Sequence, residues 1–171
     1  MKPVSEKNLA ARLNNLNERI ASACRASGRS SEAITLIGIS KTKPAEDVAA
    51  AHALGLKDFG ENYLQEASGK IDALKGLAAT WHYVGKIQSN KTKEVAKYFD
   101  WVHTVDRNKI AQRLNAQCPT NKIIQALIQV NIDEDPNKGG CSPGETLNLA
   151  QQMMLLPRIQ MRGLMTILSK D

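Results

Sequence analysis

The stretch that decides the fold is LIGISKTKPAED, residues 36–47. Its first half is an apolar run rich in β-branched residues, which is typical of a buried strand, and this run leads to Lys41. Pro44 follows at the first position of a predicted helix, and the carboxylates of Glu46 and Asp47 suit the first helical turn. A strand that passes at once into a helix predicts a βα unit. It also raises the question of why a lysine stands at the strand end.

The same unit recurs along the chain. Strand-like apolar runs lie at residues 34–40, 56–60, 81–85, 101–105, 123–131 and 159–167. Helical spacing of apolar residues is found at residues 5–27, 44–54, 62–75, 89–98, 107–117 and 143–156. The spacing also predicts Asp106 as a helix N-cap. This alternation predicts a parallel sheet with helices outside it and functional residues at the carboxyl ends of the strands. It leaves open whether the sheet is open or closed into a barrel. No GxGxxG motif follows the first strand and no P-loop is present, which disfavours a nucleotide-binding open sheet.

Length and composition describe one globular domain over residues 1–171. The chain is 42% hydrophobic and 23% charged. It shows no signal peptide and no apolar run as long as a membrane span, so we expect a cytoplasmic protein without a membrane partner. Three cysteines and three histidines match no zinc or redox spacing, so we expect no metal site. The net charge of +6 suits an anionic ligand. Aromatic residues make up only 4% and the lysines are dispersed, which disfavours nucleic acid as a partner.

Lys41 is the first candidate functional residue. Side chains alternate between the faces of a strand, so Ile37, Ile39 and Lys41 share one face. If the two isoleucines point into a barrel, Lys41 lies at its mouth, where loss of water lowers the pKa of an ammonium group, and Lys43 acts in the same direction. A lysine with a lowered pKa is a nucleophile for aldehydes. The alternative is that Lys41 extends from the strand end into solvent.

A set of motifs carries a resemblance to a known family. They lie in order along the chain: SKTKP at 40–44, FGENY at 59–63, WHYVGKIQSNK at 81–91, QVNIDEDPNKGG at 129–140 and GLMTI at 163–167. Together they resemble the pyridoxal phosphate (PLP) homeostasis proteins, the YggS/PROSC family. The resemblance implies an α/β fold, the (β/α)8 TIM barrel of the alanine racemase N-terminal type, with about six βα units in this chain. It also implies a protein that binds PLP and maintains intracellular vitamin B6 balance, with PLP-dependent apo-enzymes as partners and no established catalytic turnover.

The resemblance further implies which residues bind the cofactor. PLP would be held as a Schiff base on Lys41. Asn62, at the end of the second strand, would lie near the cofactor, and Met165 would pack near its ring. Lys138, in the loop after the fifth strand, matches a family lysine near the site.

Histidines in the strands have two readings. By the resemblance, His82 and Gly85 line the barrel mouth, and His82 belongs to the cofactor-binding set. His82 and His103 also lie between apolar neighbours, where a hydrogen-bonded core histidine is the more frequent case.

The alternative function is a PLP-dependent enzyme similar to an amino-acid racemase. Racemisation needs two bases on opposite faces of the cofactor, and related barrels take the second base from an added β-domain. We find no segment for such a domain in this chain, so we expect no enzyme activity. Racemase assays on alanine and serine discriminate the two readings.

The chain stops just after the sixth predicted strand, whereas a (β/α)8 barrel has ~250 residues. We therefore expect strands seven and eight to be missing, together with the phosphate-binding motifs that the family carries there. The chain would then be a fragment of a longer product, a truncated copy, or a protein whose open seam is covered by a second copy. The family itself is monomeric, so self-association is expected only for the shortened chain.

Overall fold

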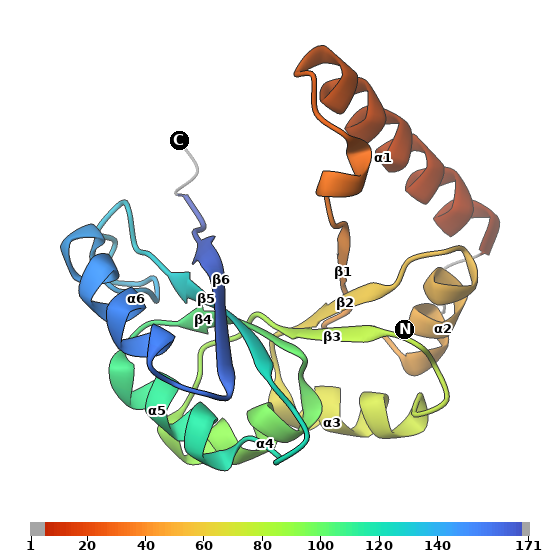
Figure 1. Ribbon diagram of the computed structural model, residues 1–171. Coiled ribbons are helices and arrows are strands. Elements are labelled where there is room, and N and C mark those ends of the chain that lie inside the picture. Colours follow the sequence, from red (N-terminus) through yellow and green to blue (C-terminus); the bar gives the residue numbers. More distant parts are fainter. Residues whose placement is uncertain (1–5, 169–171) are drawn as a thin grey trace.

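The computed structural model describes residues 6–168, which form one curved, six-stranded sheet with helices on its outer side (Figure 1). The strands lie side by side in chain order, and every neighbouring pair is parallel. They are β1 (Ile37–Ile39), β2 (Asp58–Glu61), β3 (Thr80–Tyr83), β4 (Trp101–Val105), β5 (Ile124–Gln129) and β6 (Ile159–Met165). The parallel βα architecture expected from the sequence is therefore confirmed.

A helix precedes the first strand, and one helix lies in each connection between strands. The helices are α1 (Glu6–Ala26), α2 (Ala45–Ala53), α3 (Leu64–Ala73), α4 (Thr92–Tyr98), α5 (Asn108–Gln117) and α6 (Thr146–Met154). Short 3₁₀ turns stand at Ser31–Ala33, Ser89–Lys91 and Pro143–Glu145. Figure 1 shows α1 at the β1 end of the sheet, away from α4, α5 and α6.

Several element boundaries differ from the expected ones, and three of the differences concern strand or helix ends near predicted residues. The first strand is shorter than residues 34–40, because only Ile37–Ile39 pair with β2. Pro44 is the N-cap of α2 and therefore precedes the first helical residue. Asp106 was predicted as an N-cap, but Arg107 occupies that position, and the Asp106 carboxylate accepts hydrogen bonds from the Arg107 guanidinium at 2.6 and 2.8 Å.

The sheet has a closely packed outer face and a more open inner face. Along β5, Ile124, Ala126 and Ile128 are buried toward the helices, whereas the residues between them are partly exposed. The outer face packs against fully buried helix residues such as Leu114 of α5 and Met153 of α6. The alternation arises because successive side chains of a strand point to opposite faces.

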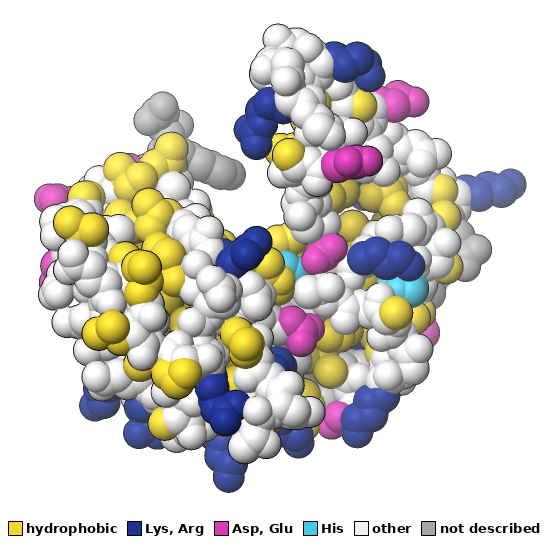
Figure 2. Space-filling model, in the orientation of Figure 1, with side chains coloured by type: hydrophobic (Ala, Val, Ile, Leu, Met, Phe, Trp, Pro, Cys, Tyr) yellow, Lys and Arg dark blue, Asp and Glu magenta, His cyan; other side chains and the backbone are white. Residues whose placement is uncertain are grey.

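Large apolar side chains are exposed around α6 and β6. Figure 2 shows hydrophobic side chains gathered over this part of the molecule. Leu147, Met154, Leu155 and Leu164 are between 58% and 82% exposed. Within residues 6–168, no helix is both long enough and apolar enough to cross a membrane.

Candidate functional site

The alternation of β1 puts Ile37 and Ile39 on the inner face of the sheet, and Lys41 follows two residues after the strand ends. A Cβ added to Gly60 would meet the side chains of Ile39 and Ile37, so these two residues lie on the same face as Gly60. The hydroxyl of the intervening Ser40 points the other way, where it donates to the Glu61 carboxylate at 2.6 Å. This arrangement confirms the predicted alternation up to the residue before Lys41.

Lys41 itself lies in a tight turn and is exposed. The Ser40 carbonyl accepts a hydrogen bond from the Lys43 N–H at 3.0 Å, which makes Lys41 and Thr42 the two central residues of a β-turn. Thr42 has φ of +63°, a conformation that β-branched residues rarely adopt. Lys41 is thus exposed among the described residues, whereas the sequence predicts a lysine shielded from water.

Asn62 and Gly85 continue the same edge of the sheet. Ile39 pairs with Gly60 in the β1–β2 register, so Lys41 and Asn62 each follow that pair by two residues. Gly85 lies against the Asn62 backbone, since a Cβ on Gly85 would lie only 2.0 Å from the Asn62 carbonyl oxygen. The Asn62 Oδ1 is buried, and among the described residues it has no hydrogen-bond partner. An exposed lysine and an unsatisfied amide oxygen therefore follow the carboxyl ends of two neighbouring strands.

A buried ammonium group lies beneath the Lys41 turn. Lys70 of α3 is only 6% exposed, and its three N–H groups donate to the Ser40 carbonyl at 2.7 Å, to Glu61 Oε1 at 2.5 Å and to Glu66 Oε1 at 3.0 Å. The same Glu66 oxygen accepts a hydrogen bond from the Thr42 N–H at 2.6 Å. One side of the turn is thus held by a buried ion-pair network.

His82 belongs to a hydrogen-bonded chain that crosses the inner face of the sheet. Its Nε2 lies 3.0 Å from the Asp58 carboxylate, and its Nδ1 lies 2.9 Å from His103 Nε2. The network assigns the tautomers: His82 donates to Asp58 and accepts from the Nε2–H of His103. Trp101 stacks on the His82 ring at 5.6 Å. His82 is therefore a satisfied, buried histidine, as in the second of its two readings, and its predicted contact with a cofactor stays a prediction.

Burial lowers the pKa of both hydrogen-bonded histidines, His82 and His103. For His103, desolvation is the main cause and the nearby His82 adds to it, so that its pKa falls to about 4. For His82, desolvation outweighs the opposing effects of Asp58 and Asp100. Both rings are consequently neutral near pH 7.

Met165 and Lys138 lie at the other end of the sheet. Met165 ends β6, and its carbonyl accepts a hydrogen bond from the Val130 N–H at 2.9 Å. Lys138 Nζ donates to Asp133 at 2.7 Å and to the Ile167 carbonyl at 3.0 Å. β6 and β1 are the two edge strands of the sheet. Met165 at the end of β6 is therefore separated from Lys41 by the four strands between them in the strand order.

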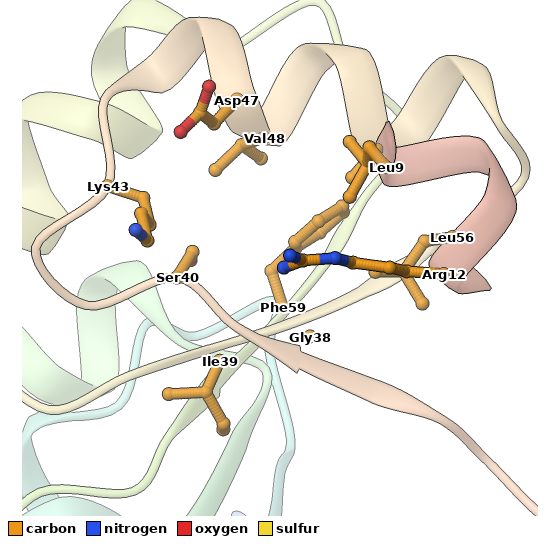
Figure 3. Close-up of a pocket in the computed structure, with 11 residues that line it drawn as sticks. Leu9, Arg12, Gly38, Ile39, Ser40, Lys43, Asp47, Val48, Leu56 and Phe59 are labelled. Carbon is orange, nitrogen blue, oxygen red and sulfur yellow. The ribbon is translucent and has the colours of Figure 1, made fainter. Parts of the chain in front are cut away.

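A pocket of about 260 Å³ opens between α1, β1 and α2 (Figure 3). Leu9, Phe59 and Val48 supply its apolar lining, and Arg12 reaches in from α1. Lys41 is not among its lining residues. The pocket therefore lies on the side of β1 that α1 and α2 cover.

The residues at this edge fit the aldehyde end of a cofactor such as PLP. An exposed primary amine can form a carbon–nitrogen bond with an aldehyde, and a buried amide oxygen without a partner can accept one hydrogen bond. Within residues 6–168, no group of three or more His, Cys, Asp or Glu side chains is arranged to hold a metal ion.

Comparison with known proteins identifies the class of fold to which this chain belongs. Residues 11–171 match the family model described as alanine racemase, N-terminal domain. The solved alanine racemase of Clostridium difficile covers 96% of this chain with a TM-score of 0.73 at 16% identity, which shows the fold alone. The fold is thus of the alanine racemase N-terminal type, as the resemblance implied, and the described residues form six parallel strands of it.

Closer relatives define the family. The pyridoxal phosphate homeostasis protein of Pseudomonas aeruginosa is 47% identical over 160 residues, covering 93% of this chain and 70% of the relative. The structure of PipY from Synechococcus elongatus with PLP bound has a TM-score of 0.74 at 34% identity and covers 89% of this chain and 70% of PipY. The chain belongs to the family of pyridoxal phosphate homeostasis proteins, and it spans about 70% of the length of these relatives.

Sequence reasoning missed the network around Lys70. Glu66 and Lys70 stand four residues apart on α3, a spacing that signals a side-chain pair, but it is also common on solvated helix surfaces. Nothing in the local sequence of either residue indicates that it contacts the turn after β1. Asp58 was likewise not identified, because a carboxylate at a strand start usually faces water.

Proposed function

We propose that this chain binds pyridoxal 5'-phosphate and takes part in PLP homeostasis, with Lys41 as the point of attachment. The observation that carries the proposal is that Lys41 is exposed and follows the carboxyl end of β1, two residues after Ile39 of the inner face. The relatives are named for PLP homeostasis, and PipY has been solved with PLP bound. The net charge of +6 suits a ligand that carries a phosphate.

Each residue of the edge has a defined task in this proposal. Lys41 would hold the cofactor through its Nζ amine, a group that can condense with an aldehyde with loss of water. Asn62 offers its unsatisfied Oδ1 to a donor of the ligand. Met165 contributes an apolar contact, and Lys138 adds positive charge in the loop after β5. When bound, PLP supplies a reactive aldehyde that holds amines and withdraws electrons from them.

The role we propose is binding and delivery without catalytic turnover, with PLP-dependent apo-enzymes as recipients. Racemisation needs a base on each face of the cofactor, and of the two residues proposed at the ends of β1 and β2, Lys41 carries an amine whereas Asn62 is uncharged. Racemase assays on alanine and serine test this point, and turnover at ordinary enzymatic rates would replace binding with catalysis as the function.

The deciding experiment is an absorbance titration of the 171-residue chain with PLP. We expect the band of lysine-bound cofactor in the wild type. Reduction with borohydride should then leave a covalent adduct on the peptide that contains Lys41. Lys41→Ala should give neither band nor adduct.

Lys43→Ala is the matched control, since it removes an amine two residues away in the same turn. It should retain the band and the adduct. An adduct that persists in Lys41→Ala, or one that is lost in Lys43→Ala instead, would assign the attachment to another lysine. A folded wild type that shows no band would contradict PLP binding by this chain.

A further inference from the structure

Thr42 is held in a strained conformation directly beside the proposed attachment residue. In the turn from Ser40 to Lys43, the third position has positive φ, as in a type II turn, where glycine is the usual residue. Threonine at such a φ costs energy, so the surrounding contacts must hold the backbone in place. The orientation of Lys41, the preceding residue, depends on the same turn.

Two hydrogen bonds from α3 hold this turn from below. Glu66 Oε1 accepts from the Thr42 N–H at 2.6 Å, and Lys70 Nζ donates to the Ser40 carbonyl at 2.7 Å. Lys70 also binds the same Glu66 oxygen at 3.0 Å, so the carboxylate cannot turn away without losing its own ion pair. The two residues are one helical turn apart, and they hold the first residue of the β-turn, Ser40, and the third, Thr42.

Burial makes this support rigid. Glu61 is fully buried and Lys70 is 6% exposed, and they form an ion pair at 2.5 Å. A buried ammonium with an acceptor for each of its N–H groups has few alternative positions. Glu66, whose side chain is 31% exposed, is the member of the network nearest to solvent.

We propose that Glu66, oriented by Lys70, is a positioning residue. It holds the turn from Ser40 to Lys43 and thereby orients the Lys41 amine toward its ligand. The inference rests on the proposed PLP binding. Glu66 does not touch the ligand in this proposal and acts only through the backbone of Thr42.

The test measures the rate of PLP capture in Glu66→Ala, followed by absorbance and by the borohydride-reduced adduct. We expect capture about tenfold slower than in the wild type, the size of effect that fits a strained residue losing its support. Adding Thr42→Gly to Glu66→Ala should restore most of the rate, because glycine adopts positive φ without help. A purely structural contribution of Glu66 would not be rescued in this way.

Two further variants sharpen the comparison. Glu66→Gln keeps an oxygen that accepts from the Thr42 N–H, so its rate should stay near that of the wild type. Glu46→Ala removes the same charge from the exposed start of α2 and should leave the rate unchanged. Hydrogen exchange of the Thr42 amide gives a readout that needs no ligand, and it should be fast in Glu66→Ala and slow in the wild type.

Each outcome decides the inference. Equal rates for wild type and Glu66→Ala, or a slow Glu66→Ala that Thr42→Gly does not rescue, would overturn it while leaving PLP binding intact. A folded wild type that captures no PLP would overturn PLP binding and this inference together. If Glu66→Ala does not fold, Glu66→Ser, which suits a first helical turn, takes its place under the same expectations.

Discussion

Gly85 stands where the ends of two strands touch. A Cβ at this position would lie 2.0 Å from the Asn62 carbonyl oxygen and 2.8 Å from the carbonyl carbon. These are backbone atoms of the neighbouring strand end, so neither can move aside like a flexible side chain. The glycine of the WHYVG motif is therefore required by close approach, and its effect reaches the candidate site through Asn62.

Gly85→Ala should lower the free energy of unfolding by about 1–3 kcal/mol, since the added methyl overpacks a rigid contact. Urea denaturation measures this change. Gly69→Ala is the control: it lies in α3 with no atom near its Cβ position, and removing a helical glycine should raise stability by up to ~1 kcal/mol. A Gly85→Ala protein as stable as the wild type would show that the two strand ends separate easily.

At the scale of elements, the Asp58–His82–His103 chain ties β2, β3 and β4 together across the inner face. Each strand contributes one side chain, so the hydrogen bonds depend on the strand register. The chain also makes this part of the sheet sensitive to pH, because its histidines are buried in the neutral form.

Stability should fall as the pH is lowered from 7.5 to 5. The pKa of His103 is about 4 in the folded chain and 6.5 in a model peptide, so the unfolded chain binds more protons in this interval. The stabilisation is complete above the unfolded pKa and is lost as the pH falls toward the folded one. Over this range the loss from His103 should be roughly 1–2 kcal/mol, measured by urea denaturation.

His103→Gln should flatten this dependence, since an amide can donate to His82 and does not titrate. His52→Gln is the control, because His52 is not part of the Asp58–His82–His103 hydrogen-bond series. Its Nε2 contacts the Ala78 carbonyl and Lys57 instead. An unchanged slope in His103→Gln would mean that other groups cause the loss of stability at low pH.

At the scale of the whole molecule, stability comes from the layer between the sheet and the outer helices. Leu114 of α5 is fully buried in this layer, and the rings of Tyr83 and Phe99 meet there edge to face at 5.0 Å. Apolar burial of this kind is the main favourable contribution to folding.

Leu114→Ala should cost about 2–5 kcal/mol in the free energy of unfolding, because it leaves a cavity in the packed layer. Leu147→Ala removes the same atoms from a side chain that is 70% exposed on α6, and it should change stability by no more than ~0.5 kcal/mol. Urea denaturation of both variants checks the contrast. Equal losses would place the stabilising core elsewhere than the outer face of the sheet.

Much of the architecture could be predicted from local patterns. The helical spacing at 143–156 corresponds to the 3₁₀ turn Pro143–Glu145 and α6, and a capping box of Ser142 and Glu145 begins this segment. The helix predicted at 44–54 is followed by Gly55, whose φ of +100° suits the end of a helix. The first strand was predicted too long, because a strand's length depends on its neighbour as well as on its own apolar residues.

The candidate site was predictable only in part. The motif pattern indicated Lys41 and Asn62, and the structure places both at the carboxyl edge of neighbouring strands. The burial that was expected for Lys41 is absent from the described residues, and no local pattern could reveal that. For His82, the apolar neighbours favoured a core histidine, and the hydrogen bonds to Asp58 and His103 agree with that reading.

The sequence by itself determined the order of strands and helices, the face that each one buries, and the place of a lysine directly after the first strand. These features follow from hydrophobic period and turn chemistry, which act over a few residues. Only the tertiary structure decided that Lys70 lies beneath Ser40, thirty residues away along the chain, and that Glu66 holds Thr42. Such contacts depend on the register of neighbouring strands and the packing of α3 against them, and no local pattern encodes either.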